Sequence, residues 1–204
     1  MLATANPNKE REIREIFARA GLTAELLSRP PGVPEVEETE VTLLGNALLK
    51  AQALVAVTGT AAIAEDTGLE VDALGGAPGV RSARFAGEPP DDGANVEKLL
   101  AELARAGRQG REQRQARFVT IAVASWPDGR EVSSEGAVEG WIATERRGDG
   151  GFGYDPVFVP TEGDGRTFAE LAAESSAAKH ALSHRGRAFT ALAERLGSTA
   201  PRAL

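Results

Sequence analysis

Apolar residues recur three or four positions apart in the first twenty residues, which is the spacing of one face of an α-helix. Ile13 and Phe17 lie on that face, and Asn6 and Pro7 come just before it. Asn is a favoured N-cap, Pro fits the first helical turn, and Gly commonly follows the last turn. The pattern therefore predicts a helix that begins near Pro7 and ends before Gly21.

A second helix is predicted after Thr42. Its apolar stripe consists of Leu43, Leu44, Ala47, Leu48, Ala51, Leu54 and Val55. Asn46 and Lys50 are four residues apart and share a different face of this helix, which is left for chemistry. The same periodicity predicts a helix over residues 91–106 and a helical C-terminal third from residue 168 to about residue 196.

Short apolar or β-branched runs bounded by turn residues predict strands. These runs are residues 22–27, 61–64, 117–124, 131–139 and 157–159, and a further short strand is expected before Thr4. Residues 117–124 and 131–139 form a hairpin around a Trp-Pro-Asp-Gly turn. Glu65 and Asp66 follow the strand at 61–64 and are expected at its end. Because strands mix with helices throughout, the predicted fold class is α/β, with a mixed, twisted sheet flanked by helices.

Composition narrows the possible classes of protein. The 204 residues, 42% of them apolar, fit one domain, including one built as two lobes. The absence of cysteine excludes disulfides, thiolate metal sites and cysteine nucleophiles. A net charge of −7 argues against a surface that binds nucleic acid generally. No apolar run has the length of a membrane span and no signal peptide is visible, so the expected location is the cytoplasm, away from any membrane.

Thr4, Asn6 and Lys9 cluster where the first strand should turn into the first helix. Free backbone N–H groups and the positive helix end attract anions at such a junction, and Lys9 adds a full charge. Taken alone, the segment is more typical of an ordinary capped helix than of a phosphate site. Lys50 and Lys179 are further candidates for phosphate, because the chain has few lysines and arginine is its general-purpose cation.

Two pairs of acids, Glu37 with Glu38 and Glu65 with Asp66, are candidate ligands of a hard cation. Mg²⁺ takes a few carboxylate oxygens and completes its coordination with water and substrate phosphates. The first pair belongs to the acidic run 35–40, which is also typical of a solvated loop. Asp66 is the stronger candidate, because burial of an acid behind an apolar strand costs desolvation energy that function often explains.

The loop from Gly151 to Asp155 combines glycines with two aromatic residues and an acid. A nucleobase could stack there, although the same aromatic residues would also anchor a tight turn. His184 and Arg185 both donate hydrogen bonds, as recognition of a keto oxygen requires, but they would also suit an exposed helix. The sequence argues against a serine-hydrolase pair of Ser183 and His184, because neighbours on a helix point to different faces.

Five motifs, in this order, resemble the inosine triphosphatase family, the pyrophosphatases of non-canonical purine nucleoside triphosphates. They are Thr4-x-Asn6-x-x-Lys9, Glu65-Asp66-Thr67-Gly68-Leu69, Gly79-Val80-Arg81-Ser82-Ala83-Arg84, Gly151-Phe152-Gly153-Tyr154-Asp155-Pro156 and Ser183-His184-Arg185-Gly186. The resemblance implies a single domain over residues 1–204, with two lobes and a central active-site cleft. It also implies a homodimer that hydrolyses ITP, dITP or XTP to the monophosphate and pyrophosphate with Mg²⁺, and so cleanses the nucleotide pool.

The resemblance also assigns phosphate and metal roles by position. Thr4, Asn6 and Lys9 match the phosphate loop, and Lys50 matches a second phosphate-binding lysine. Asp66 matches the catalytic acid, which is both a metal ligand and the base for the attacking water, and Glu38 matches a metal-site carboxylate. Thr67 stands at a substrate-binding position where the family frequently has Ser, and Glu65 stands where it frequently has Asp.

The remaining positions concern the base. Phe152, Gly153, Tyr154 and Asp155 match the loop that holds it, and Lys179, His184 and Arg185 match the group near the base and its 6-keto oxygen. Donors at that position would reject ATP, because the amino group of adenine would leave them unpaired. Two alternatives stay open. One is a Maf-type nucleotide pyrophosphatase, and the other is a nucleotide-binding module without turnover.

Overall fold

The computed structural model describes residues 1–22, 24–34 and 36–199, apart from the side chains of residues 176–178 and 198–199. The chain divides into two compact units. Unit 1 comprises Met1–Asp66, Thr120–Gly136 and Arg185–Leu204, and unit 2 comprises Thr67–Val119 and Ala137–His184. Each unit has a hydrophobic core of its own, drawn from its own segments.

Five strands form one sheet in the described part of the chain, in the order β2-β1-β3-β4-β5. Their bounds are Ala62–Val71 for β1, Pro78–Gly79 for β2, Gln115–Ser125 for β3, Glu131–Ile142 for β4 and Phe158–Pro160 for β5. Within unit 2, β2 pairs antiparallel with β1 and β5 pairs antiparallel with β4. Leu2 adds a parallel bridge to Ile63 in unit 1. The predicted α/β fold class is confirmed.

The helices of unit 1 follow the predicted caps. Helix α1 (Pro7–Arg19) begins after Asn6, whose side chain accepts hydrogen bonds from the N–H groups of Asn8 and Lys9. Helix α2 (Leu43–Thr58) begins after Thr42 and ends at a left-handed glycine. One residue of its predicted apolar stripe, Leu44, is exposed rather than buried.

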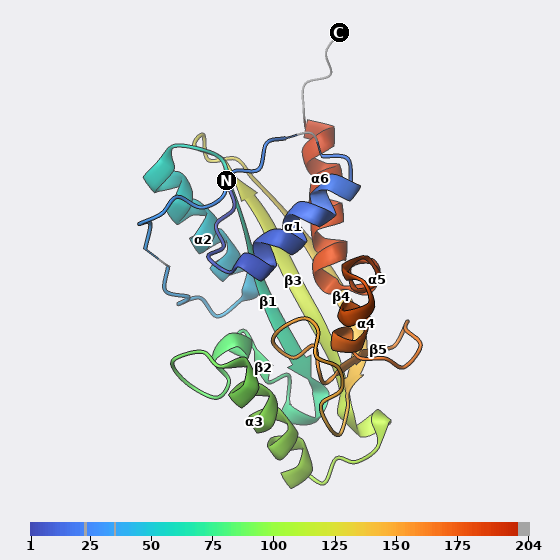
Figure 1. The fold of residues 1–204 in the computed structure, drawn as a ribbon. Coiled ribbons are helices and arrows are strands. Elements are labelled where there is room, and N and C mark those ends of the chain that lie inside the picture. The colour runs from blue at the N-terminus through green and yellow to red at the C-terminus, as the bar shows by residue number, and fades with distance from the viewer. Residues whose placement is uncertain (23, 35, 200–204) are drawn as a thin grey trace. The chain divides into compact units, whose positions relative to one another are not determined.

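Helices α1 and α6 (His184–Thr199) lie side by side (Figure 1). Phe17 of α1 meets Phe189 of α6 edge to face, with 5.3 Å between the ring centroids. Leu2, Ala122 and Leu192 belong to the same buried cluster. Phe17 anchors this core because it lies on the apolar face of α1 that the sequence predicts.

Two strand predictions differ from the structure. The strand predicted at 61–64 continues to Val71, so Glu65 and Asp66 lie in its middle rather than at its end. The strand continues because Leu69 and Val71 are buried in the core of unit 2. The strand predicted at residues 22–27 is wrong for its described residues, which exclude Thr23. Leu22 and Leu26 pack against the core of unit 1, and only Leu27 accepts a backbone hydrogen bond, from Leu2.

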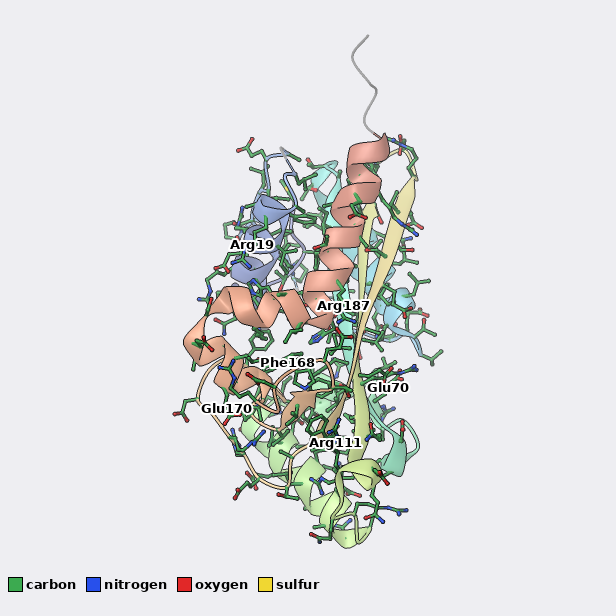
Figure 2. The ribbon with its side chains drawn as sticks, turned by 90° about the vertical axis from the view of Figure 1, so that its right-hand side faces the viewer. Arg19, Glu70, Arg111, Phe168, Glu170 and Arg187 are labelled. Atoms are coloured by element: carbon green, nitrogen blue, oxygen red, sulfur yellow. The ribbon has the colours of Figure 1, made fainter. Side chains whose placement is uncertain are left out.

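Unit 2 contains α3 (Asp92–Arg105), α4 (Phe168–Glu174) and α5 (Ser176–Leu182), with the short 3₁₀ helices η1 (Asp72–Leu74), η2 (Ser82–Arg84) and η3 (Arg111–Arg114). Three aromatic rings lie at the centre of its core. The Phe158 ring centroid is 4.7 Å from that of Phe118 and 5.0 Å from that of Phe168. Figure 2 labels Phe168 on α4 together with Glu170, which is less buried. Among the described residues, no helix has the length and apolar character needed to cross a membrane.

Replacing Phe158 with alanine removes the ring between Phe118 and Phe168 and leaves a cavity in a fully buried site. We expect the free energy of unfolding to fall by about 3–5 kcal/mol, measured by urea denaturation. The control is Val41→Ala, whose side chain is 86% exposed and whose change should stay within about 0.5 kcal/mol. Equal losses in both variants would contradict the description of this core.

Candidate functional site

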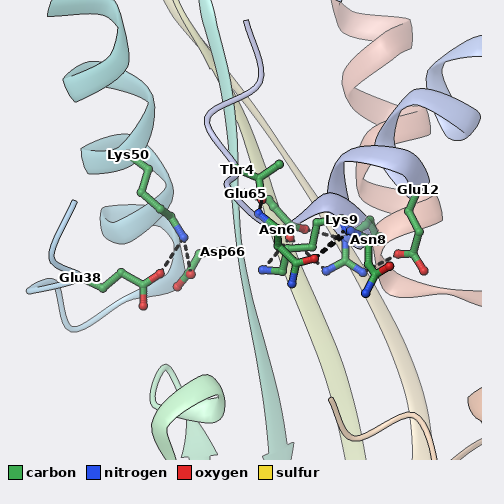
Figure 3. Close-up of polar contacts among 10 residues, drawn as sticks. Thr4, Asn6, Asn8, Lys9, Glu12, Glu38, Lys50, Glu65 and Asp66 are labelled. Atoms are coloured by element: carbon green, nitrogen blue, oxygen red, sulfur yellow. Dashed lines mark hydrogen bonds and ion pairs between the residues drawn. The ribbon is translucent and has the colours of Figure 1, made fainter. Parts of the chain in front are cut away.

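Two carboxylates and an ammonium group converge beside β1 in unit 1 (Figure 3). Lys50 Nζ, on α2, donates to Asp66 Oδ1 at 2.7 Å and to Glu38 Oε1 at 2.9 Å. Glu38 comes from the loop before α2 and Asp66 from the middle of β1. The structure thus brings together three residues that the sequence analysis proposed from three separate elements.

Asp66 is almost fully buried, with 6% of its surface exposed. Burial raises the pKa of the Asp66 carboxyl, and the charge of Lys50 offsets only part of that increase. Burial alone would lower the pKa of Lys50, but the charges of Asp66 and Glu38 raise it. Asn46 is also buried and donates through Nδ2 to Asp66 Oδ2 at 3.4 Å, so the polar face predicted for α2 does point at this acid.

Glu65, the neighbour of Asp66 on β1, belongs to a second cluster. Successive side chains of a strand point to opposite faces, and Figure 3 shows these two carboxylates in different groups. Arg185 donates two hydrogen bonds to Glu65, from Nε to Oε2 at 2.9 Å and from Nη2 to Oε1 at 3.0 Å. Lys9 Nζ approaches the same carboxylate at 3.0 Å, and Arg185 Nη1 also donates to Glu12 Oε2 at 2.8 Å. Four charges therefore alternate in sign along a chain in which Glu12, Glu65 and Arg185 are buried and Lys9 is partly exposed.

This cluster gives Glu65 a different electrostatic state from Asp66. Burial disfavours the charge of Glu65, but Arg185 and Lys9 outweigh burial and hold its pKa well below the usual range. Burial likewise opposes the charge of Arg185, and Glu65 and Glu12 overcome it, so the pKa of Arg185 is raised. Glu65 is thus a fixed anion, while Asp66 is the carboxylate that takes up a proton more readily than an ordinary aspartate.

The predicted phosphate loop has fewer free N–H groups than expected. The N–H of Asn6 donates to Thr4 Oγ1, and the N–H groups of Asn8 and Lys9 donate to Asn6 Oδ1. The side chains of Thr4 and Asn6 therefore satisfy the backbone of the first turn. An anion here would meet the Asn6 amide group, the Thr4 hydroxyl and the Lys9 ammonium group.

The base loop of unit 2 is organised by Asp155. Its Oδ2 accepts from the N–H of Phe152 at 2.9 Å and from Lys179 Nζ at 2.7 Å. Lys179 is buried and lies 4.8 Å from the centre of the Phe152 ring. Gly151, at φ +74°, is needed because a Cβ there would collide with the Asp155 carboxylate. Gly153 follows in the loop, and its N–H donates to Asp92 Oδ2.

Tyr154 and His184 are both buried in unit 2. The hydroxyl of Tyr154 donates to the carbonyl of Ser82 at 2.8 Å, and burial together with Asp92 raises its pKa. His184 stacks on Phe118, with ring centroids 4.3 Å apart. Thr67 is the residue of β1 after Asp66 and is partly buried. Tyr154 thus anchors this loop to the core, as the simpler interpretation predicted, whereas Phe152 is only partly buried.

The sequence analysis missed Glu12 and the full role of Asn46. One local signal for Glu12 existed, because it lies three residues after Lys9 and shares a helix face with it. No signal in the sequence indicated its contact with Arg185, which is 173 residues away. In the described part of the chain, no three His, Asp or Glu side chains are grouped to hold a metal alone. Glu38 and Asp66, which already converge on one cation, nevertheless fit Mg²⁺, because that ion needs only one or two carboxylates beside water and phosphate.

Comparisons with known proteins agree over nearly the whole chain. A model of the Ham1 family matches residues 1–195. A dITP/XTP pyrophosphatase from Streptomyces coelicolor is 49% identical over 194 residues, covering 94% of each chain. The solved structure of a HAM1 protein from Coxiella burnetii matches with a TM-score of 0.84 and 35% identity over 97% of this chain and 98% of its own. A nucleoside-triphosphatase / dITP/XTP pyrophosphatase from Mycobacterium abscessus matches with a TM-score of 0.72 and 44% identity over 96% and 97%.

The buried ion cluster predicts how stability responds to Glu65→Gln. The variant leaves Arg185 buried with half of its carboxylate partners, so we expect a loss of about 3–5 kcal/mol in the free energy of unfolding near neutral pH. Glu70→Gln is the control, because it removes the partially exposed pair with Arg117 and should cost less than about 1 kcal/mol. Similar small losses in both variants would contradict the cluster.

The same cluster predicts a pH dependence. Because the pKa of Glu65 is lowered in the folded state, its stabilisation is fully present above 4.5, its ordinary value, and is lost as the pH falls through the lower folded pKa. We therefore expect the wild-type free energy of unfolding to fall on acidification below 4.5, and to fall less steeply in Glu65→Gln. Identical slopes in urea titrations at several acidic pH values would refute this assignment.

Proposed function

Because this chain belongs to the Ham1 family, we propose that it hydrolyses non-canonical purine nucleoside triphosphates, ITP, dITP and XTP, to the monophosphate and pyrophosphate. The match bears out the resemblance read from the five motifs, and relatives in Streptomyces coelicolor and Mycobacterium abscessus carry the name dITP/XTP pyrophosphatase. The observation that carries the proposal is the convergence of Asp66 and Glu38 on the Lys50 ammonium group. A buried and a partly buried acid beside a cation suit attack of water on a phosphoryl centre.

Unit 1 supplies the groups for the triphosphate. Lys9 and Lys50 are compact positive charges, and the N-terminal end of α1 adds the positive end of its dipole. Thr4 and Asn6 contribute a hydroxyl and an amide group at the same helix end. Phosphoryl transfer asks mainly for positioning and charge neutralisation, which these residues provide.

Asp66 acts as the general base in this proposal. Its raised pKa favours acceptance of a proton from the attacking water, and Lys50 and Asn46 hold its two carboxylate oxygens. Glu38 and Asp66 would hold Mg²⁺, which when bound neutralises charge on the phosphate oxygens. Glu65 stays ionised and positions Lys9 and Arg185 rather than exchanging protons.

Unit 2 supplies the loop for the base. The Phe152 ring is an aromatic platform, kept in place by the hydrogen bonds of Asp155 to the Phe152 N–H and to Lys179. Gly153, Tyr154, Thr67 and His184 complete the proposed substrate-binding set of unit 2, and Arg185 belongs to unit 1. In this assignment, N–H groups near the 6-position donate to a keto oxygen and would be left unpaired by the amino group of adenine.

We further propose that residues 1–204 act as one two-lobed domain that assembles as a homodimer in the cytoplasm, without nucleic-acid or membrane partners. The family resemblance supports the dimer, and the net charge of −7 opposes nucleic acid as a partner. Sedimentation at several protein concentrations tests the dimer, and a monomer at all of them would refute it.

The proposed function predicts which nucleotides the protein hydrolyses. With Mg²⁺, the protein should release pyrophosphate from ITP, dITP and XTP at least about a hundredfold faster, in kcat/KM, than from ATP, and chelator should abolish release. The assay measures pyrophosphate for each nucleotide in parallel, with dTTP included. Preference for dTTP would favour a Maf-type enzyme instead, and binding of ITP without release would leave a module without turnover.

A further prediction concerns the proposed general base, Asp66. Asp66→Asn removes the proton acceptor while keeping the shape of the side chain, and should lower kcat for ITP by about 10²–10⁴-fold. Glu37→Gln is the matched control, because Glu37 is exposed and adjacent to Glu38 and should leave kcat unchanged. Glu38→Gln should raise the Mg²⁺ concentration needed for half-maximal activity. Full activity of Asp66→Asn would overturn the mechanism.

A further inference from the structure

Five arginines recur at every third position between α3 and β3, at residues 105, 108, 111, 114 and 117. The outer two are paired with acids, Arg105 with Glu102 and Arg117 with Glu70. Among the described residues, none of the inner three arginines (Arg108, Arg111 and Arg114) has a carboxylate partner. This is unusual in a chain with a net charge of −7, and it concentrates unneutralised positive charge in one segment of unit 2.

Two of the inner arginines are aligned by local structure. Arg111 and Arg114 are the ends of η3, and a 3₁₀ helix has three residues per turn, so their side chains leave the same face. Both line a cavity of about 280 Å³ that is also lined by Trp141, Glu145 and Arg147. Three positive charges and one negative charge therefore surround this cavity.

The guanidinium group of Arg111 is positioned by the Trp141 ring. Its guanidinium carbon lies 3.7 Å from the centre of the Trp141 ring, a cation–π contact that fixes the plane of the guanidinium group. The described contacts of Arg111 use none of its side-chain N–H donors in a hydrogen bond. A stacked guanidinium presents those donors at its edge, in the fork geometry that suits phosphate oxygens.

Arg114 is a buried cation without a carboxylate. It is 3% exposed, and its guanidinium donates only to carbonyls: Nε to Ile142 at 2.6 Å, Nη1 to Arg108 at 2.8 Å and Nη2 to Ala143 at 2.7 Å. A guanidinium has five N–H donors, so two are not used by the described contacts. Burial also lowers the pKa of Arg114, since carbonyl dipoles do not replace an anion.

From this geometry we propose that the cavity between η3 and Trp141 is a binding site for a compact phosphate anion, inorganic phosphate or pyrophosphate. Arg111 and Arg114 are its principal ligands, and Arg147 adds a positive charge that Glu170, 3.6 Å away, partly neutralises. A volume of about 280 Å³ lies at the lower end of the range for small-molecule sites, which favours a compact anion over a whole nucleotide. The proposal is independent of the catalytic function proposed above.

The test uses tryptophan fluorescence. The chain has two tryptophans, so Trp126→Phe leaves Trp141 as the single emitter. We expect titration with pyrophosphate, with chelator present and at constant ionic strength, to give a saturable change in Trp141 emission. Inorganic phosphate, sulfate and a purine nucleoside monophosphate are titrated in parallel.

Two substitutions in this background separate the site from general charge effects. Arg111→Gln should weaken pyrophosphate binding by at least about tenfold, through loss of a charge-assisted fork, and Arg111→Lys should weaken it less. Arg111 is exposed, so both variants should fold. Arg130→Gln is the matched control, since Arg130 also lies over a tryptophan position but is paired with Asp128, and it should not alter binding.

The outcomes decide the proposal. A saturable response that Arg111→Gln weakens and Arg130→Gln does not would support it. No saturable response, equal affinities in the Trp126→Phe protein with and without Arg111→Gln, or sulfate binding as tightly as pyrophosphate would overturn it. Tighter binding of the nucleoside monophosphate than of pyrophosphate would overturn the assignment to a compact anion.

Discussion

Two adjacent carboxylates, Glu65 and Asp66, lie buried in the middle of β1, and each must meet positive charge on its own side of the strand. A buried carboxylate without a partner costs several kcal/mol, so this requirement determines what packs beside β1 in unit 1. Lys50 of α2 forms an ion pair with Asp66, whereas Lys9 of α1 and Arg185 of α6 form ion pairs with Glu65. Three helices are thereby tied to one dipeptide of the chain.

The same dipeptide also separates two chemical roles. Glu65 receives two cations and stays ionised, while Asp66 shares a single cation with Glu38 and has a raised pKa. Neighbouring acids with pKa values pushed apart by their surroundings commonly divide structural and proton-transfer roles. The ionised Glu65 keeps Lys9 next to the N-terminus of α1, where a phosphate would lie. The Glu65 cluster therefore supports the catalytic role that we propose for Asp66.

Local patterns predicted what local interactions determine. Asn6 and Thr42 mark the starts of α1 and α2, and the hairpin of β3 and β4 lies around its predicted turn. Long-range contacts could not be predicted from these local patterns. The length of β1 depends on the core of unit 2, and the contact of Glu12 with Arg185 joins residues 173 positions apart. Asp66 was a candidate because an acid after an apolar strand is conspicuous in sequence, but its partner Lys50 was only one of three candidate lysines.

The central claim is that Asp66 is the base and that Lys50 controls its proton affinity. The most direct test is the pH dependence of kcat/KM for ITP in the wild type and in Lys50→Met, because the acidic limb reports the pKa of the base in the free enzyme. Activity should fall at a pH above the ordinary aspartate value of 3.8, and the limb should move to higher pH in Lys50→Met, since the ammonium that lowers the pKa is gone. An acidic limb at the same pH in both proteins would contradict the account.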